Sequence, residues 1–254
     1  MADPLTLPDP EPIDEGPLAG THRWTFQVVA SEELTSEVRR LHLRAPHLDR
    51  LDARPGQDLM VAVPTDATDG PSTVNRRYSI RQVVASDPGH VVVDVVTHGG
   101  GPGARWASTA QAGEVVVAVG PRGKVLVDAD ASSHLFMGDA AGAPASLSMV
   151  ESVPGSGRAL LVVDSDDQVQ PTTADGSVTW LVGASPDEVA ERLVAEIGDA
   201  PAGLHVYLAG ERRDIARWRD VLLAAGVESD QISSKAYWSR GAANAAHGEP
   251  ARQG

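Results

Sequence analysis

Short segments rich in apolar and β-branched residues follow one another through the first half of the chain. Turn signals such as Arg54-Pro55-Gly56 and Asp87-Pro88-Gly89 separate them. The segments are RWTFQVVA (23–30), EVRRLHLRA (37–45), DLMVAVP (58–64), RRYSIRQVV (76–84), HVVVDVVTH (90–98) and GEVVVAVG (113–120). Six short strands at this spacing predict a six-stranded antiparallel β-barrel.

From about residue 130 the pattern changes to buried strands that alternate with helices. Nearly continuous apolar runs, typical of buried parallel strands, are HLFMG (134–138), RALLVVDS (158–165), SVTWLVG (177–183) and LHVYLAG (204–210). One helical pattern starts after Ser185 and ends at Gly198, and a second covers 212–226. Alternation of strand and helix predicts a parallel-sheet, nucleotide-binding α/β domain.

These patterns divide the chain into four parts. Residues 1–20 are rich in Pro, Asp and Glu, and residues 242–254 are small and polar, so we expect both segments to be disordered tails. Between them we expect a β-barrel domain at 21–129 and an α/β domain at 130–241.

Composition narrows the class of protein. The 254 residues carry a formal net charge of -14, which argues against nucleic acid or an anionic membrane surface as a partner. There is no cysteine, and the N-terminus has neither the basic nor the apolar region of a signal peptide. No apolar run approaches the ~20 residues of a membrane span. We therefore expect a cytoplasmic, monomeric protein without membrane insertion.

A cluster of arginines around a tyrosine and a serine, RRYSIR (76–81), is the first candidate site. On a single strand, residues 77, 79 and 81 would face one side, and residues 78 and 80 the other. Arginine is well shaped to hold a phosphate, and a tyrosine ring can stack on an aromatic ligand. Taken alone, the cluster fits a surface strand with solvated arginines better than it fits a ligand site.

The second candidate is the glycine-rich segment DVVTHGGGPGARWAS (94–108), in which a strand leads to a helix starting near Gly103 or Ala104. Glycines allow a ligand to approach the backbone, and a helix N-terminus attracts an anion. A long hairpin turn is the alternative. We interpret His98, His134 and His205 as structural residues and expect no metal site, because no second ligand has a suitable spacing.

Two further candidates lie where predicted parallel strands end. These are FMGDAAGAPA (136–145) and YLAGERRD (207–214), which would share one edge of the sheet. Sheets of this kind bind nucleotides at the carboxyl edge of their strands. Neither segment has the G-x-G-x-x-G spacing. Together, a barrel that holds a flavin and an α/β domain that brings a nicotinamide to it would account for all four candidates.

The motifs, in their order, resemble those of the siderophore-interacting proteins, flavin-dependent ferric-siderophore reductases of the ferredoxin-reductase-like superfamily. The resemblance rests on Arg76 to Arg81, on Asp94 to Gly99, on Gly101-Pro102-Gly103-Ala104-Arg105-Trp106-Ala107, on Gly120-Pro121-Arg122-Gly123, on Ala209-Gly210-Glu211 and on Tyr237-Trp238-Ser239-Arg240-Gly241. It covers residues from about 20 to 241.

The resemblance implies an enzyme with FAD as cofactor, NADH or NADPH as electron donor and a ferric siderophore as small-molecule substrate, from which iron is released as Fe(II). The implied cofactor-binding residues are Arg76, Arg77, Tyr78, Ser79, Ile80, Asp94, Val96, Thr97, His98, Pro102, Gly103, Ala104, Arg105, Trp106, Asp139, Gly210, Glu211, Tyr237 and Trp238. The implied basic residues around the substrate are Arg122, Lys124, Lys235 and Arg240. No side chain is expected to act as acid or base.

One motif departs from the family pattern. Where the family has Gly-Asp-Glu-Thr-Ala-x-Pro-Ala, this chain has Ala140 and Ala141 in place of the Glu and Thr. This leaves open a different electron donor, or a flavin-binding protein of the same fold without nicotinamide-dependent activity. A third alternative, independent of these alanines, is a protein that only binds siderophores and holds no flavin. For the donor we favour NADH, because neither strand-end segment carries an obvious clamp for a 2′-phosphate, although Arg212 and Arg213 follow closely.

Overall fold

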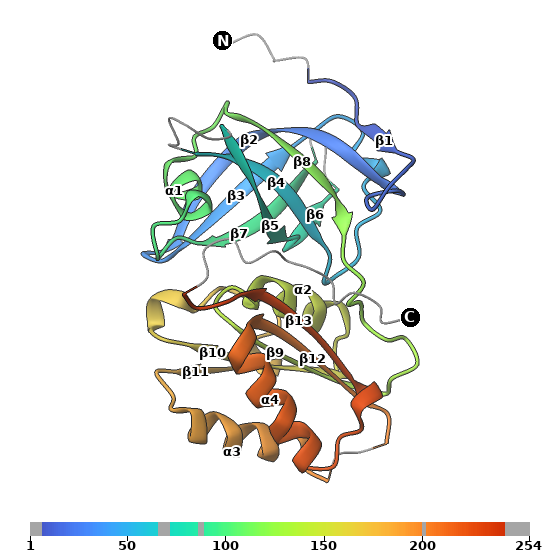
Figure 1. Ribbon diagram of the computed structural model, residues 1–254, viewed down its shortest axis with the longest axis vertical. Coiled ribbons are helices and arrows are strands. Elements are labelled where there is room, and N and C mark those ends of the chain that lie inside the picture. The colour runs from blue at the N-terminus through green and yellow to red at the C-terminus, as the bar shows by residue number, and fades with distance from the viewer. Residues whose placement is uncertain (1–6, 66–71, 86–88, 200–201, 242–254) are drawn as a thin grey trace. The chain divides into compact units, whose positions relative to one another are not determined.

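A computed structural model describes residues 7–65, 72–85, 89–199 and 202–241. The chain folds as two compact units, residues 1–127 and 128–254. Each unit is described by itself, and Figure 1 labels its elements. The second predicted tail, 242–254, lies outside the described residues.

The first unit is an antiparallel barrel. Its strands are β1 (Glu11–Ile13), β2 (Thr21–Thr35), β3 (Val38–Arg44), β4 (Asp58–Pro64), β5 (Thr73–Ser79), β6 (Gln82–Val84), β7 (His90–Val96) and β8 (Val115–Arg122). Along the sheet the order is β5-β4-β8-β2-β3-β7-β6, with β1 added to β2. Only Ile80 and Arg81 separate the two edge strands β5 and β6 in sequence, so the sheet curls until its edges meet.

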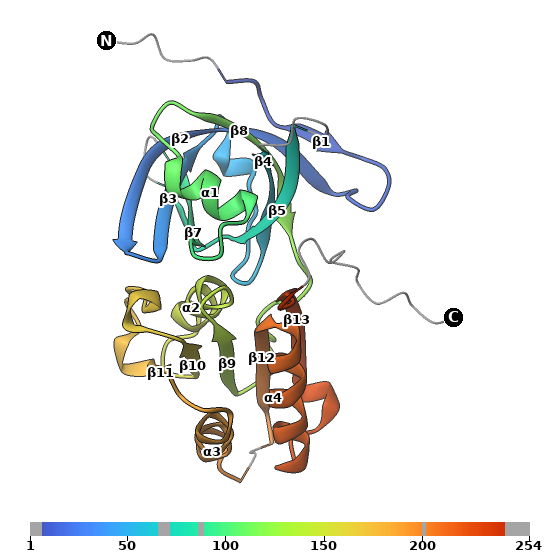
Figure 2. The ribbon, with the colours of Figure 1, turned by 60° about the vertical axis from the view of Figure 1, so that its left-hand side comes forward.

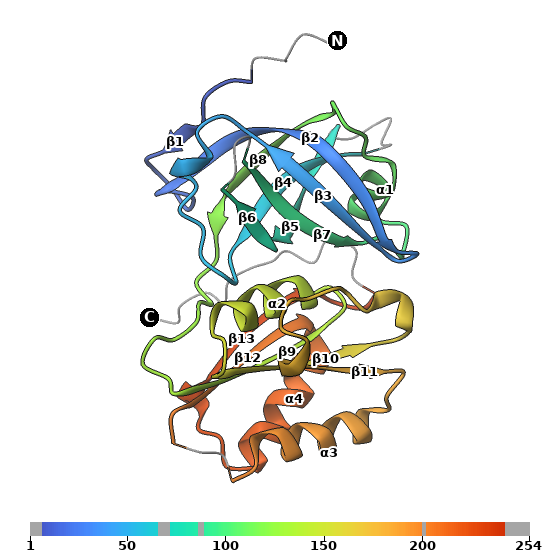
Figure 3. The ribbon, with the colours of Figure 1, turned by 180° about the vertical axis from the view of Figure 1, so that it is seen from behind.

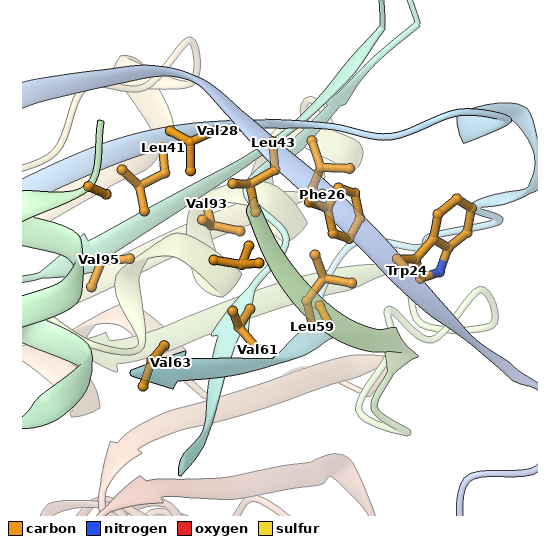
Figure 4. Close-up of a cluster of buried hydrophobic side chains, with 14 of the residues drawn as sticks. Trp24, Phe26, Val28, Leu41, Leu43, Leu59, Val61, Val63, Val93 and Val95 are labelled. Carbon is orange, nitrogen blue, oxygen red and sulfur yellow. The ribbon is translucent and has the colours of Figure 1, made fainter. Parts of the chain in front are cut away.

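Alternating side chains from these strands fill the barrel. Trp24, Phe26 and Val28 come from β2, and Leu41 and Leu43 from β3 (Figure 4). All five are completely buried. The spacing of two places every second residue of a strand inside, which is the pattern that the sequence predicts for a half-buried strand. Helix α1 (Pro102–Thr109) contacts β3, β4 and β7, and contributes Trp106 to the core (Figure 2).

Two expectations for this unit need correction. The segment 76–84, predicted as one strand, forms two, because the chain turns at Ile80 and Arg81 from β4 to the opposite edge of the sheet. The predicted tail 1–20 is partly ordered: β1 pairs with β2, with Glu11 opposite Arg23, and Pro10 is buried. A three-residue edge strand has no recognisable sequence pattern when most of its residues are acidic or proline, so the sequence did not predict β1.

The second unit is a parallel sheet with helices on both faces. Its strands are β9 (Ser133–Asp139), β10 (Gly157–Val163), β11 (Val178–Val182), β12 (Leu204–Glu211) and β13 (Ile232–Trp238), in the order β11-β10-β9-β12-β13. All pairings are parallel. From β9 the chain adds β10 and β11 on one side and then returns to add β12 and β13 on the other. The topological switch point therefore lies between β9 and β12.

Helices cover the two faces of this sheet (Figure 3). Helix α2 (Ala143–Ser152) packs on β9 and β10, while α3 (Pro186–Ile197) and α4 (Arg212–Ala224) pack on the other face around Leu193, Trp218 and Leu222. A capping box between Ser185 and Glu188 starts α3, as the sequence predicts.

The sequence did not predict the fifth strand, β13. Its residues, ISSKAYW, include two serines and a lysine, and only Ile232 is fully buried. An edge strand that is half exposed lacks the continuous apolar run that marks its neighbours. Among the described residues, no helix is long and apolar enough to cross a membrane.

Candidate functional site

Strand β5 presents its two arginines to opposite sides. Arg76 and Tyr78 share the side that meets α1, whereas Arg77 turns away and forms a two-point ion pair with Asp58, with Nε–Oδ1 and Nη2–Oδ2 distances of 3.0 and 2.5 Å. Asp58 is 2% exposed, so Arg77 neutralises a buried carboxylate. The structure therefore brings Arg76 and Tyr78 together on one side of β5 and pairs Arg77 with Asp58 on the other. The binding of the cofactor by Arg77 stays a prediction.

Tyr78 fits against the first turn of α1 only because residue 103 is glycine. A Cβ atom there would collide with the Tyr78 hydroxyl and would lie 3.3 Å from Cγ of Arg76. The hydroxyl is buried and has no hydrogen-bond partner among the described residues. Burial raises the pKa of Tyr78 well above its ordinary value, against the opposing effect of the Arg76 charge, so the phenol stays neutral.

The start of α1 is open to a ligand. Gly99 and Gly100 have φ angles of 88° and 63° and are exposed, and Pro102 occupies the first turn. The first N–H groups of a helix have no partner within it, which favours an anion there. Arg76, the buried donor of Tyr78 and this helix start form one cradle, which has the cation and hydrogen-bond donors that a diphosphate requires. We call these residues the Arg76 cradle.

A hollow of about 340 Å³ lies beside the same helix start. Four predicted cofactor residues line it, namely Thr97, Pro102, Arg105 and Trp106. Four further residues line the hollow but were not predicted as cofactor ligands: Pro64, Gly100, Ser108 and Thr109. Pro64 ends β4, far away in sequence, and only the barrel closure brings it here.

Other predicted residues of the barrel have structural partners. Asp94 is buried and receives two hydrogen bonds of 2.7 Å from Arg40, with Arg81 Nε at 3.9 Å. Trp106 donates to Glu114 at 2.9 Å. Ser79 and Ile80 are buried, and Ile80 belongs to the core. Val96 is the last residue of β7, and the Thr97 N–H donates a hydrogen bond to the Glu37 carbonyl. His98 is exposed in the following turn, and Ala104 is half-buried in α1.

In the second unit, the carboxylate of Asp139 ties three strands together at the switch point. It accepts hydrogen bonds from Gly142 N at 2.8 Å, from Glu211 N at 2.8 Å and from Trp238 Nε1 at 2.7 Å. Burial raises the pKa of Asp139, although these hydrogen bonds oppose the shift. The predicted residues Asp139, Glu211 and Trp238 therefore meet, and Asp139 holds the turn after β9 against β12 and β13.

Glycines allow this close packing. A Cβ at Gly142 would collide with the Ala209 carbonyl, and one at Gly138 would lie 3.0 Å from the same oxygen. Gly210 has a φ of 147° and lies directly against the Asp139 carboxylate. The strand-end glycines read from the sequence thus mark a tight crossing of backbones at the carboxyl edge.

Glu211 caps α4. Its carboxylate accepts from the backbone N–H groups of Arg213, Asp214 and Arg240, the last at 2.9 Å. Burial alone would raise the pKa of Glu211, but these hydrogen bonds outweigh it and hold the pKa below its ordinary value. Glu211 is therefore a buried anion that orders the start of α4 and the end of the described chain.

The four basic residues predicted around the substrate are divided between the units. Arg122 ends β8 with its Nη1 3.0 Å from the Met60 sulfur, and Lys124 is exposed two residues later. In the second unit, the Lys235 Nζ lies 5.7 Å from the Tyr237 ring centroid and the Arg240 guanidinium 5.8 Å from that of Trp238. Their role toward a substrate remains a prediction. Among the described residues, no group of three or more His, Asp or Glu is placed to hold a metal ion.

An antiparallel barrel followed by a five-stranded parallel sheet with this strand order is the ferredoxin-reductase-like fold. Phthalate dioxygenase reductase has the same fold, with a TM-score of 0.71 over 89% of this chain and 70% of that one, at 18% identity. The predicted fold class is therefore confirmed.

Two family models match within this fold: "Siderophore-interacting FAD-binding domain" at residues 62–125 and "Siderophore-interacting protein" at 131–241. The chain belongs to the siderophore-interacting protein family, as its motifs suggest. An FAD-binding domain is thus present, and the Arg76 cradle, with its orphan donor and its glycine-dependent packing, fits the cofactor.

Relatives and solved structures agree with this assignment. Ferric vibriobactin reductase ViuB of Vibrio cholerae is 28% identical over 179 residues, 66% of this chain and 65% of its own length. An NADPH-dependent ferric-chelate reductase of Escherichia coli is 24% identical over 58% of this chain and 60% of its own length. A siderophore utilization protein from T. fusca has a TM-score of 0.75 at 25% identity, covering 91% of this chain and 97% of that one. The match to ViuB thus spans 65% of that relative's length.

Proposed function

We propose that the protein is an FAD-dependent reductase that passes electrons from NADH or NADPH to Fe(III) held by a siderophore, which releases the iron as Fe(II). The observation that carries the proposal is the joint match of a siderophore-interacting FAD-binding domain and a siderophore-interacting domain, on a fold with a diphosphate cradle and a nucleotide-type switch point. Relatives named as ferric reductases support it.

The residues of the chain supply binding and order. Arg76 and the first N–H groups of α1 would hold the diphosphate of FAD, and Tyr78 would offer its neutral O–H to the same ligand. At the switch point, the turn that Asp139 fixes would receive the pyridine nucleotide. Bound FAD supplies the conversion between a two-electron hydride donor and a one-electron iron acceptor.

The test begins with the absorption spectrum of the purified protein, which should show bound flavin. Under anaerobic conditions, NADH or NADPH should bleach the flavin band, and adding a ferric siderophore should restore it. A ferrous chelator in the same cuvette should report Fe(II) in proportion to the dinucleotide consumed. Purification without flavin, together with failure to bind added FAD, would contradict the proposal.

A second function is favoured by Ala140 and Ala141, which stand where the family motif has Glu and Thr. Ala140 is 6% exposed, and neither alanine can offer a hydrogen bond from its side chain. A flavin protein of this fold without nicotinamide-dependent activity would keep the Arg76 cradle and lose only the donor. It predicts a yellow protein that neither dinucleotide bleaches, while a chemical reductant does.

A further inference from the structure

A serine, a histidine and an aspartate from three separate segments lie next to one another at the amino end of the parallel sheet. Ser233 lies near the start of β13, His205 near the start of β12, and Asp128 precedes β9. The Ser233 Oγ is 2.9 Å from the His205 Nε2. The His205 Nδ1 is 3.4 Å from the Asp128 Oδ2. All three residues belong to the second unit, at the ends of the strands opposite the switch point.

Each ring nitrogen of His205 meets the partner that a nucleophilic serine requires. In such sites a carboxylate binds the Nδ1–H of the histidine, which leaves Nε2 to take the proton of the serine hydroxyl. Here the carboxylate lies beside Nδ1 and the hydroxyl beside Nε2, so both neighbours are on the correct side of the ring. A proton on Nδ1, facing the charge of Asp128, makes Nε2 the acceptor for the Ser233 hydroxyl.

Further contacts hold Asp128 and His205 in these positions. The Asp128 Oδ1 accepts from the Asp130 N–H at 3.0 Å, and the Asp128 N–H donates to the Tyr207 hydroxyl at 2.7 Å. The Tyr207 ring lies against the His205 ring, with centroids 4.7 Å apart and an interplanar angle of 32°. Tyr207 is itself buried and stacks on Phe136. The carboxylate and the imidazole are thus held in advance in the geometry that proton transfer needs.

The surroundings of His205 keep it a neutral base at neutral pH. Only 13% of its side chain is exposed, and burial lowers its pKa against the opposing charges of Asp128 and Asp230. The other titratable groups near it are Tyr207 on the same strand and His134 on β9. Burial raises the pKa of Tyr207 and lowers that of His134, so both stay uncharged. The Nε2 of His205 is therefore free to accept the hydroxyl proton.

Ser233 lies where a small ligand can reach it. It is half-buried, and 42% of the Asp128 side chain is exposed. Within the described ranges β13 pairs with β12 alone, so its other side is an edge of the sheet. An edge strand leaves the N–H groups of its outer side without strand partners, and backbone N–H groups are the usual donors to the oxyanion of a reacting ester. The serine therefore stands on a strand that offers such donors.

From this geometry we infer that Ser233 and His205 form a hydrolytic site for carboxylic esters with good leaving groups, such as aryl esters, with Asp128 as the positioning residue of His205. The site uses no residue of the Arg76 cradle or of the switch point. The Ser233 Oγ forms a bond to the ester carbonyl carbon while the His205 Nε2 takes its proton. The bond to the leaving oxygen then breaks as the imidazolium returns that proton to it. Water attacks the acyl-serine in the same way, which releases the acid and restores the hydroxyl.

A fluorophosphonate probe tests the nucleophile directly, because it forms a P–O bond with an activated serine and releases fluoride. Peptide mass spectrometry of the full-length protein should find the probe on Ser233. Ser233→Ala should abolish labelling, whereas the matched control Ser234→Ala, which removes the exposed neighbouring serine, should leave it unchanged. His205→Gln should slow labelling at least about a hundredfold. Asp128→Asn should slow it at least about tenfold, and Asp128→Glu should restore part of the rate. Hydrolysis of p-nitrophenyl acetate should follow the same order.

A thiol in place of the hydroxyl gives a second measurement, without background because the chain has no cysteine. In Ser233→Cys, His205 should stabilise the thiolate. Iodoacetamide at pH 7 should then alkylate this thiol at least about tenfold faster than the thiol of Ser234→Cys. Adding His205→Gln to Ser233→Cys should remove the difference. Circular dichroism shows whether each variant is folded, and if His205→Gln is not, the comparison of the two thiols decides alone.

Either of two results would overturn the inference: labelling of Ser233 no faster than that of Ser234, or equal alkylation of the two thiols. The contact between His205 and Ser233 would then be a structural tie between β12 and β13. Neither result bears on the proposed reductase. Ser233→Ala should leave the flavin content and the reduction of the flavin by a dinucleotide unchanged, and a loss of that reduction would assign the serine to the reductase and overturn the separate site.

Discussion

The indole N–H of Trp238 donates to the carboxylate of Asp139 at 2.7 Å, although their strands, β13 and β9, are separated in the sheet by β12. The bond passes over the end of β12, where the Glu211 N–H reaches the same oxygen at 2.8 Å. The Asp139 carboxylate thus connects the ends of β9, β12 and β13 beyond their backbone pairing. It fixes the edge of the sheet where a nucleotide would bind.

Trp238→Phe should therefore destabilise the protein by about 1–3 kcal/mol, since a buried carboxylate loses one of its donors. The matched control is Trp180→Phe on β11, because Trp180 is also half-buried and shares none of these contacts. Denaturant unfolding followed by circular dichroism measures both. Equal losses in the two variants would mean that ring packing, and not the bond to Asp139, stabilises this edge.

Gly103→Ala tests the contact between α1 and Tyr78. Alanine should stabilise a helix by about 0.5–1 kcal/mol relative to glycine, but overpacking costs about 1–3 kcal/mol. The collision of the new methyl group with the Tyr78 hydroxyl should outweigh the gain in helix propensity. Gly103→Ala should therefore lower both the free energy of unfolding and the flavin content. With Tyr78→Phe in the same chain, the clash disappears and the loss of stability should shrink. Strict additivity in this double-mutant cycle would contradict the contact.

The two arginines of β5 should behave differently when replaced. Arg76→Ala should lower the ratio of flavin absorbance to protein absorbance, with the unfolding free energy of the flavin-free protein within about 0.5 kcal/mol of the original. Arg77→Ala should destabilise the protein by about 3–5 kcal/mol, because it removes the cation that neutralises the buried Asp58 carboxylate. Release of flavin from Arg77→Ala without loss of stability would instead favour the predicted role of Arg77 in binding the phosphate.

Acid should weaken the second unit through two histidines. Burial lowers the pKa of His134 and of His205, although the charge of Asp128 opposes the shift for both. The unfolded chain then gains protons first, so stability is complete above the unfolded pKa of about 6.5 and falls as the pH drops below it. The slope should approach about 1.4 kcal/mol per pH unit for each histidine that stays neutral.

His134→Gln should flatten this dependence between pH 7.5 and 5.5, as measured by unfolding free energies at each pH. His98→Gln is the control, because His98 is exposed in the glycine-rich turn. A slope in His134→Gln as steep as in the original chain would show that other groups cause the acid sensitivity.

The basic residues expected around the substrate give the last prediction. Arg122→Ala and Arg240→Ala should each raise the half-saturating concentration of an anionic ferric siderophore, because a chain of net charge -14 needs local cations to attract it. The rate with a neutral ferric chelate and the flavin content should change little. Equal losses on both substrates would assign these residues to the fold or to the flavin.

Sequence patterns predicted the elements whose burial is periodic. The apolar and β-branched run at 23–30 predicted β2, and the helical pattern after Ser185 predicted the start of α3. Strand β13 was not predicted, because an edge strand exposes many of its residues. The break at Ile80 and Arg81 was not predicted either, because only the closure of the barrel requires it.

For the candidate site, local motifs singled out Arg76, Tyr78 and Gly103, which the structure brings together, but did not separate them from Arg77. That separation depends on Asp58, which lies on a different strand and pairs with Arg77 only after β4 and β5 are in register. Likewise, nothing in the sequence around Gln168 and Gln170 marks them as buried residues that anchor a loop. Their significance comes from partners at Asp164 and Ala140, which a single sequence does not reveal.

Glu211 has a practical consequence for anyone who produces this protein. Because its carboxylate holds the Arg240 N–H at 2.9 Å, the last described residues are tethered to the start of α4 at the nucleotide edge. An affinity tag fused shortly after Gly241 would emerge beside that edge and compete for the space that a dinucleotide needs. Shortening the chain before Arg240 would remove a donor from a buried anion. A cleavable tag at the other terminus avoids both effects and keeps nucleotide-binding measurements interpretable.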